Sequence, residues 1–174
     1  MSSSYVGGKM KRLILVGGTM GVGKTAASLA LAGILPDNVF LDGDWCWKMN
    51  PFIVNDSTKA MVMDNITHLL SNFLRCNIIE NVIFCWVMHE QAIIDEILSR
   101  LPLDGVSVSA ISLVCSEAAL RERLAGDIAA GIRTVDVIER SIPRLSLYEN
   151  LSTVKIDTTT LSPEETAEKI KEIL

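Results

Sequence analysis

The sequence contains a glycine-rich octapeptide, Gly18-Thr19-Met20-Gly21-Val22-Gly23-Lys24-Thr25, that fits the pattern G-x-x-x-x-G-K-[ST]. Residues 13–16 before it are apolar and predict a buried strand, and the Ala- and Leu-rich residues 25–35 after it predict a helix. Between a strand and a helix, glycines let successive backbone N–H groups turn toward one point, and the helix N-terminus adds a partial positive charge. The octapeptide is therefore predicted to bind phosphate groups.

A nucleotide is the expected ligand of this loop. Lys24 is expected to reach the β- and γ-phosphates, and the hydroxyl of Thr25 is expected to ligate Mg²⁺. The sequence has no Asn-Lys-x-Asp guanine-reading motif, which counts against a GTPase. ATP and Mg²⁺ are the predicted cofactors, and the loop residues expected to bind the nucleotide are Gly18, Met20, Gly21, Val22, Gly23, Lys24 and Thr25.

Length and composition favour one globular domain. Of the 174 residues, 49% are hydrophobic and 21% are charged. We expect a single domain over residues 12–174, with residues 1–11 as a flexible leader. The net charge of −5 argues against a nucleic-acid partner, and no apolar run approaches the length of a transmembrane helix. These features predict a cytoplasmic protein without a membrane partner, and they leave the oligomeric state open.

Strand-like and helix-like segments alternate along the chain. Further strands are predicted at residues 39–41, 82–88, 106–114 and 154–156, and most segments between them show helical spacing of apolar residues or helix caps. Residues 45–52 lack a clear period and are expected to form an irregular loop. The alternation predicts a parallel α/β sheet with helices on both faces, in which ligands bind beyond the carboxyl ends of the strands.

Two aspartates, Asp42 and Asp44, follow the predicted second strand. Because alternate residues of a strand point the same way, both carboxylates are able to face the phosphate-binding loop. Transfer of a phosphoryl group to an alcohol needs one group to accept the hydroxyl proton and another near the metal. Two carboxylates suit this division, and the alternative is an Asp-Gly-Asp turn that only caps the next segment.

Arginines are concentrated in the span after Ser116. Arginine binds phosphate oxygens bidentately and neutralises charge on a transferred phosphoryl group, whereas the alternative is a solvated helix face paired with glutamates. Gly126 and Gly131 suit the hinges of a mobile cover, so a lid is predicted at about residues 124–140. We expect two or three of the arginines to act on phosphate; the five are Arg121, Arg123, Arg133, Arg140 and Arg144.

Three features together resemble the P-loop small-molecule kinases, a group that includes gluconate kinase, adenylylsulfate kinase, shikimate kinase and chloramphenicol phosphotransferase. They are the loop at residues 18–25, the run Leu41-Asp42-Gly43-Asp44, and the run Leu120-Arg121-Glu122-Arg123-Leu124 followed by further arginines. The resemblance covers most of the chain in order. It implies the three-layer α/β/α P-loop NTPase fold, with a five-stranded parallel sheet in the order 2-3-1-4-5 and a lid.

The resemblance also implies roles for individual residues. By position, Asp44 matches the carboxylate that binds or deprotonates the acceptor hydroxyl, and Asp42 matches one near the metal. Arg123 matches the arginine at the start of the lid segment, and Arg133 is a second lid residue expected to contact phosphate. Thr158 lies in the loop that matches the segment beside adenine, so it joins the expected nucleotide-binding residues.

The chain departs from this family pattern in two places. No aspartate ends the third strand, and His89 and Glu90 follow it instead. The carboxylate beside the metal is therefore expected to be Asp42 or Glu90. Trp45 and Trp47 stand where a sugar-acid kinase would carry basic or polar residues. They predict a flat or partly apolar acceptor, such as a nucleoside or an aromatic natural product, or else they pack beneath the acceptor-binding helix.

The combined features predict an ATP-dependent, Mg²⁺-requiring kinase that phosphorylates a hydroxyl of a small molecule. Lys24, Asp44, Arg123 and Arg133 are the predicted catalytic residues; Thr25 and Asp42 are the predicted metal ligands, and Asp42, Asp44, Trp45 and Trp47 are the predicted substrate-binding residues. One alternative is a nucleoside, nucleotide or polynucleotide 5′-end kinase, although no nucleic-acid partner is expected for an acidic chain. Another is a nucleotide-binding regulatory ATPase module. The identity of the acceptor does not follow from the sequence.

Overall fold

In the computed structural model, which describes residues 10–174, five strands form one sheet in the order β2-β3-β1-β4-β5. The neighbouring strands pair in parallel, which confirms the predicted sheet and strand order. Most of the predicted leader lies outside the described residues, and the first strand begins at Lys11. The strands are β1 (Lys11–Gly17), β2 (Asn38–Asp42), β3 (Asn81–Cys85), β4 (Val106–Val114) and β5 (Val154–Asp157).

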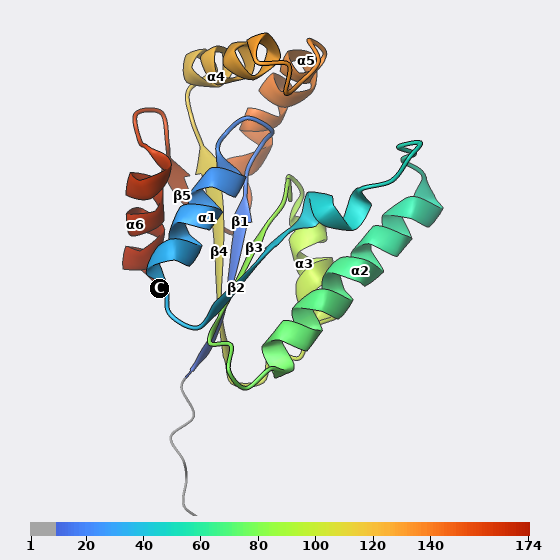
Figure 1. The fold of residues 1–174 in the computed structure, drawn as a ribbon, viewed down its shortest axis with the longest axis vertical. Helices are drawn as coiled ribbons and strands as arrows, with labels where there is room; N and C mark the ends of the chain where they lie inside the picture. The colour runs from blue at the N-terminus through green and yellow to red at the C-terminus, as the bar shows by residue number, and fades with distance from the viewer. Residues whose placement is uncertain (1–9) are drawn as a thin grey trace, which may run out of the picture.

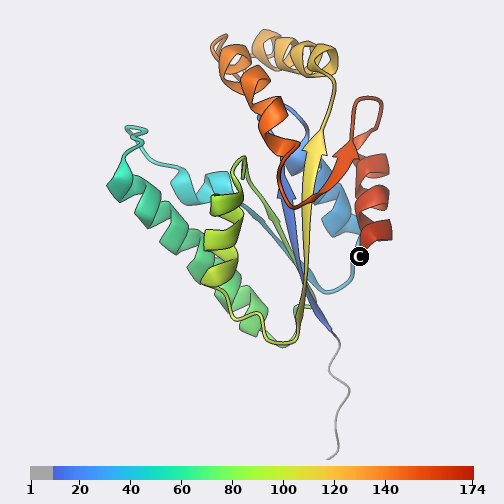
Figure 2. The same ribbon diagram turned by 180° about the vertical axis from the view of Figure 1, so that it is seen from behind.

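Helices cover both faces of the sheet and one of its ends (Figure 1). One face carries α1 (Lys24–Ile34) and α6 (Pro163–Ile173), and the other carries α2 (Asp56–Arg75) and α3 (Gln91–Ser99). Figures 1 and 2 show α4 (Glu117–Ala129) and α5 (Val137–Ser141) beyond the carboxyl ends of the strands. Two 3₁₀ helices, η1 (Gly43–Trp47) and η2 (Ile142–Tyr148), complete the three-layer arrangement. None of the helices within residues 10–174 is long and apolar enough to cross a bilayer.

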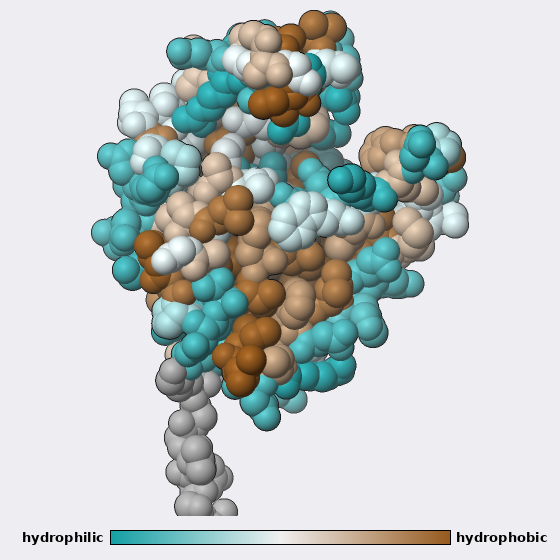
Figure 3. Space-filling view, in the orientation of Figure 1, coloured by the Kyte–Doolittle hydropathy of each residue, from teal (hydrophilic) through white to brown (hydrophobic). Residues whose placement is uncertain are grey.

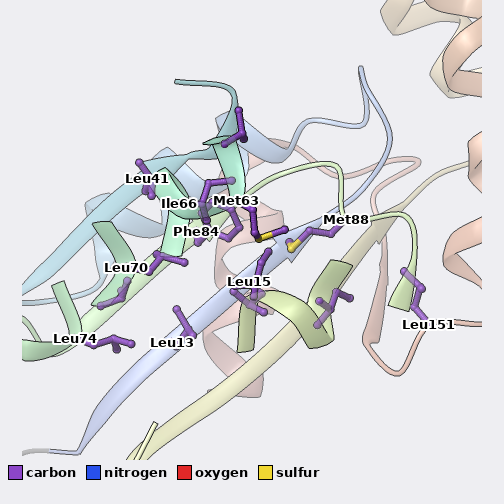
Figure 4. Close-up of a cluster of buried hydrophobic side chains, with 14 of the residues drawn as sticks. Leu13, Leu15, Leu41, Met63, Ile66, Leu70, Leu74, Phe84, Met88 and Leu151 are labelled. Carbon is purple, nitrogen blue, oxygen red and sulfur yellow. The ribbon is translucent and has the colours of Figure 1, made fainter. Parts of the chain in front are cut away.

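The core consists of two apolar layers that share the central strand β1. Alternate residues of a strand point to opposite faces, so Leu13 and Leu15 pack against α2 and α3, while Ile14 and Val16 pack against α1 and α6. All four side chains are fully buried, as expected for a central parallel strand covered on both faces. Figure 4 shows the first of these layers, in which Leu13 and Leu15 lie near Phe84.

The third strand is shorter than predicted, ending at Cys85 rather than at residue 88. Val16 of β1 and Asp42 of β2 are the last residues paired in register with β3, and Asp42 is also the last residue of β2. The backbone then leaves the extended conformation, and Met88 has a φ of 33°. Residues 86–88 therefore form a loop at the ligand-binding edge of the sheet.

The irregular loop predicted at residues 45–52 is wrong only for residues 45–47, which belong to the helix η1. The Asp42 side chain caps η1 by accepting the N–H of Asp44 at 3.0 Å. The helix α5 starts at Val137, and the Thr134 hydroxyl bonds to the carboxylate of Asp136, the residue that precedes the helix. Pro143 then lies in η2, because proline lacks the N–H that an α-helix needs.

Tyr148, at the end of η2, joins this segment to the loop after β3. Its side chain is fully buried, and its hydroxyl donates a hydrogen bond to the carbonyl of Val87. Burial raises the pKa of the phenol, so the hydroxyl stays protonated and keeps donating at neutral pH.

Replacing Tyr148 by Phe is expected to lower the free energy of unfolding by about 0.5–1.5 kcal/mol, because the Val87 carbonyl loses the phenol donor and keeps only the Gly18 N–H at 3.5 Å. Urea unfolding followed by circular dichroism measures the change. Glu149→Gln, at the neighbouring exposed position, serves as the control and should leave the midpoint unchanged. A Tyr148→Phe variant as stable as the parent protein would contradict the structural role given to this hydroxyl.

Candidate active site

The predicted phosphate-binding loop lies between β1 and α1, at the carboxyl edge of the sheet. The ammonium of Lys24 donates a hydrogen bond across the loop to the carbonyl of Thr19 at 3.0 Å. Burial lowers the pKa of Lys24, while nearby Cys85, Asp44 and Asp42 act in the opposite direction. A partly buried cation whose hydrogen-bond partner is a neutral carbonyl makes this loop a strong site for an anion.

Contacts with α4 and α5 determine the shape of the loop. Gly21 has a φ of 82°, and a Cβ at this position would lie 2.5 Å from Cδ2 of Leu124, so both its conformation and the space require glycine. The Met20 side chain packs against the apolar cluster of α4 and α5. The hydroxyl of Thr19 donates to the carbonyl of Ser141 at 3.0 Å. The loop is therefore fastened to the helices that the sequence predicts as a lid.

A chain of hydrogen bonds connects the loop to both predicted aspartates. The Thr25 hydroxyl donates to Oδ2 of Asp42 at 2.7 Å, and Oδ1 of Asp42 accepts the N–H of Asp44 at 3.0 Å. Burial and the neighbouring Asp42 raise the pKa of the Asp44 carboxyl, while Lys24 and a hydrogen bond with Trp86 oppose the rise. The structure thus brings the aspartates together beside the loop, as the sequence predicts.

Cys85 occupies the end of β3, where the sequence lacks an aspartate. It pairs in register with Asp42, and its thiol forms hydrogen bonds with Asp42 and Thr25. Burial is the main cause that raises the pKa of this thiol to about 12, so it is protonated and neutral at physiological pH. His89 and Glu90 lie beyond, with His89 Nε2 3.4 Å from the exposed Glu90 carboxylate. The carboxylate beside Thr25 therefore comes from β2.

The oxygen atoms of Thr25 and Asp42 fit the preferences of Mg²⁺. Among residues 10–174, no group of three or more His, Cys, Asp or Glu side chains is arranged to hold a metal ion. Protein-bound Mg²⁺ commonly uses one or two carboxylates and takes its remaining ligands from substrate phosphates and water. A hydroxyl and a carboxylate at the phosphate-binding loop suit that mode of binding.

A cavity of about 340 Å³ runs along the outer side of the loop. Residues 21–27 form one wall, and α4, the residues after it and the loop after β5 supply Arg123, Asp127, Arg133 and Thr158. This volume lies in the range of small-ligand sites. Arg123, Arg133 and Thr158 are predicted site residues, and Asp127 is a residue that sequence reasoning missed.

Arg123 connects the phosphate-binding loop with the loop after β5. One guanidinium nitrogen donates to the Val22 carbonyl and to the Thr158 hydroxyl, both at 3.2 Å, and the other donates to the carbonyl of Thr158. Thr158 is buried, and its N–H donates to the Val114 carbonyl at 2.8 Å. Arg123 therefore holds together the two segments expected to border the nucleotide.

The turn that ends α4 brings Arg133 to the cavity. The N–H groups of Gly131 and Ile132 donate to the carbonyls of Ile128 and Asp127, which is the Schellman pattern, and Gly131 has a φ of 71°. The chain turns back on itself, and Nε of Arg133 comes within 2.9 Å of Asp127 Oδ2. The pair lines the cavity, so the fold holds the Arg133 guanidinium in place before any ligand binds.

The remaining arginines lie elsewhere. Arg121 and Arg140 form exposed ion pairs one helical turn away, with Glu117 and Asp136. Arg144 lies near His89, whose pKa is lowered by burial first and by the Arg144 charge second. Two of the five arginines therefore line the cavity, and two are in surface ion pairs.

The two tryptophans predicted to bind substrate, Trp45 and Trp47, contact different aromatic rings. Trp45 packs edge-on against Phe40, with ring centroids 5.4 Å apart. Trp47 instead contacts Phe52 and Trp86, with ring centroids 5.7 and 6.4 Å apart. Only Trp47 of the predicted pair therefore belongs to a larger aromatic group.

Trp86 is a second site residue that sequence reasoning missed, because it lies inside the segment predicted as the third strand. With β3 ending at Cys85, Trp86 is the first residue beyond the sheet edge, where its side chain bonds to Asp44. A Cβ on Gly43 would lie 2.5 Å from Cγ of the Trp86 ring, so the indole rests directly on the η1 backbone. Residue size at position 43 thus controls where Trp86 and Asp44 sit.

Comparison with known proteins identifies the family. A family model described as an AAA domain matches residues 14–139, which include the phosphate-binding loop, both aspartates and the arginines of α4. The chain belongs to this AAA domain family. A search of curated protein sequences gave no significant match.

Solved structures share the fold of this AAA domain along nearly the whole chain. A tunicamycin resistance protein of Deinococcus radiodurans is 24% identical over 94% of this chain and 95% of its own, with a TM-score of 0.71. A gluconokinase of Sinorhizobium meliloti is 18% identical over 95% and 94%, with a TM-score of 0.65. A shikimate kinase of Acinetobacter baumannii, solved with shikimate, is 21% identical over 95% and 93%, with a TM-score of 0.63. The resemblance to the P-loop kinases is confirmed as a shared fold.

Gly43→Ala is expected to destabilise the protein by about 1–3 kcal/mol, because the new methyl group would overlap the Trp86 ring. Gly126→Ala provides a matched control of opposite sign. Its Cβ would meet nothing within 4 Å in the last turn of α4, so it should stabilise by about 0.5–1 kcal/mol. Urea midpoints measure both, and a neutral Gly43→Ala variant would show that Trp86 does not rest on η1.

Proposed function

We propose that the protein is an ATP-dependent kinase that transfers the γ-phosphate to a hydroxyl group of a small molecule. The observation that carries this proposal is the chain from Thr25 through Asp42 to Asp44, with bonds of 2.7 and 3.0 Å. A site that only binds a nucleotide needs no second carboxylate at this point. Phosphorylation of an alcohol does need a group that takes the hydroxyl proton.

In this proposal ATP occupies the cavity along the phosphate-binding loop. Lys24 and the backbone of residues 20–25 bind the β- and γ-phosphates, and Thr158 borders the base. Thr25 and Asp42 would hold Mg²⁺, which supplies neutralisation of the phosphate charge when it is bound. The family match and the kinases that share the fold support this assignment.

Asp44 has the position and the environment of a general base. Its carboxylate takes the proton of the acceptor hydroxyl while the acceptor oxygen forms a bond to the γ-phosphorus and the bond to the ADP oxygen breaks. Because its pKa is raised, the carboxylate is a stronger proton acceptor than an exposed aspartate. The Trp86 indole beside the carboxylate favours its ionised form.

Residues 124–140, from the second half of α4 into α5, act as the lid in this proposal. Arg133 neutralises charge on the transferred group, and Asp127 orients its guanidinium, since the two side chains are 2.9 Å apart at the cavity wall. Arg123 keeps the loop after β5 against the phosphate-binding loop. A closed lid excludes water, which suppresses hydrolysis of ATP in the absence of an acceptor.

Asp44→Asn is expected to reduce phosphoryl transfer by about 10²- to 10⁴-fold while ATP binding is retained, because the amide keeps the shape but accepts no proton. In the parent enzyme the rate should fall with decreasing pH at a higher pH than an ordinary aspartate would give, since the pKa of Asp44 is raised. Transfer of labelled γ-phosphate from ATP to a panel of alcohols, measured across pH, checks both expectations.

Lys24→Ala is the companion variant and should lose transfer together with affinity for ATP. An Asp44→Asn variant with parental rates would remove Asp44 as the base. ATP hydrolysis that is steady and indifferent to every added alcohol would instead support a regulatory ATPase and contradict the kinase proposal.

A further inference from the structure

Three aromatic rings meet beside Asp44. Trp47 is their centre, because its ring contacts both Phe52 at 5.7 Å and Trp86 at 6.4 Å between centroids. The rings come from η1, from the loop before α2 and from the residue after β3, which are distant in sequence. Trp47 and Trp86 are partly buried and pack against the core, so these two rings are held in place.

The aromatic group is attached to the proposed base. The Trp86 side chain bonds to the Asp44 carboxylate, and the indole N–H is the only hydrogen-bond donor that tryptophan offers. Gly43 leaves no room between η1 and the Trp86 ring. An acceptor whose hydroxyl meets Asp44 therefore places its neighbouring atoms beside Trp86 and Trp47.

Apolar side chains continue outward from these rings into solvent. Phe52, Ile53 and Val54 are 65%, 44% and 54% exposed, although they are consecutive and apolar. A contiguous exposed patch of this kind marks a binding surface more often than scattered single residues do. Figure 3 shows that the molecule is hollowed between the projecting segment before α2, which contains residues 52–54, and the helices α4 and α5.

Hydrogen bonds hold the apolar segment in its exposed position. The indole N–H of Trp47 donates to the Ile53 carbonyl at 3.4 Å, and the Thr58 hydroxyl donates to the same carbonyl at 2.9 Å. Asn55 and Thr58 form a reciprocal capping box at the start of α2. The segment is thus shaped by its own contacts, and its side chains are presented to a ligand in advance.

The charge of this segment selects against anions. Between Gly43 and Asp56, Lys48 is the one lysine or arginine, while Asp44 and Asp56 are both negative. A carboxylate or phosphate on the acceptor would meet repulsion from Asp44 with little compensation from this segment. A neutral ring meets no such penalty and gains contact area on the aromatic faces.

We propose that the acceptor is a neutral alcohol carrying a flat ring, held with its ring on Trp47 and Phe52 and its hydroxyl at Asp44. This inference rests on the proposed function for the role of Asp44, and it narrows the substrate class. It excludes sugar acids and other small anions as preferred acceptors. The selectivity resides in the aromatic contact, because the hydroxyl alone is common to all alcohols.

The test compares acceptors that share their sugar and differ in the ring. Phenyl and methyl β-D-glucoside form one pair, uridine and methyl β-D-riboside form another, and gluconate serves as the anion. Binding is measured by calorimetry in the presence of Mg²⁺ and a non-hydrolysable ATP analogue, and transfer is measured separately with ATP. In at least one pair the ringed member should bind about tenfold more tightly, which corresponds to about 1.4 kcal/mol.

Phe52→Ala is the decisive variant, since an exposed side chain is removed without opening the core. It should abolish most of the preference for the ringed member. Ile78→Ala, at an apolar side chain that is 80% exposed just beyond the other end of α2, should retain it. Circular dichroism confirms that both variants fold.

The outcomes separate this inference from the proposed function. Equal binding within both pairs, no binding of either ringed compound, or a preference for gluconate would overturn the inference, even if transfer occurs. A ring preference that depends on Phe52 without transfer to any alcohol would sustain the aromatic site and contradict the kinase proposal. A preference that survives Phe52→Ala would overturn the placement of the ring.

Discussion

The hydrogen bond from the Thr25 hydroxyl to the Asp42 carboxylate organises the site. It connects the start of α1, which follows β1, with the end of β2, which β3 separates from β1 in the sheet, and Asp42 is almost fully buried. The second oxygen of the same carboxylate caps η1, so the direction of η1 follows from it. Cys85 between them is a neutral thiol, which leaves Asp42 as the source of negative charge beside Thr25. One buried carboxylate therefore links the phosphate side to the acceptor side.

A second set of contacts couples the phosphate-binding loop to the helices above it. Gly21 lies against Leu124, and Met20 packs into the apolar cluster of α4 and α5. Any movement of these helices must be accommodated by the loop, because interiors packed at this density transmit displacement. The Schellman turn at Gly131 sets Arg133 at the cavity wall independently of ligand. Positioning of charge before binding is what phosphoryl transfer requires most of its protein.

The architecture and the nucleotide side were predictable from sequence because they depend on local signals. The alternation of strand-like and helix-like segments predicts the parallel sheet. The spacing of glycines, lysine and threonine in residues 18–25 is specific for phosphate binding. The acceptor side was less predictable because it depends on where the sheet ends. Trp86 joins the site because β3 stops at Cys85, and that end is set by the pairing of β3 with β1 and β2. Asp127 was missed for a similar reason, because its pairing depends on a helix end that returns the chain to it.

The most direct measurement is the affinity for ATP with Mg²⁺ and with EDTA, by calorimetry, in the parent protein, Asp42→Asn and Glu90→Gln. If Asp42 serves as the metal-side carboxylate, Asp42→Asn loses about 10- to 100-fold of the Mg²⁺-dependent gain in affinity and keeps its affinity in EDTA. Glu90→Gln, at the other carboxylate considered, keeps the gain. An Asp42→Asn variant that retains the full Mg²⁺-dependent gain would contradict the organising role of the Thr25–Asp42 pair.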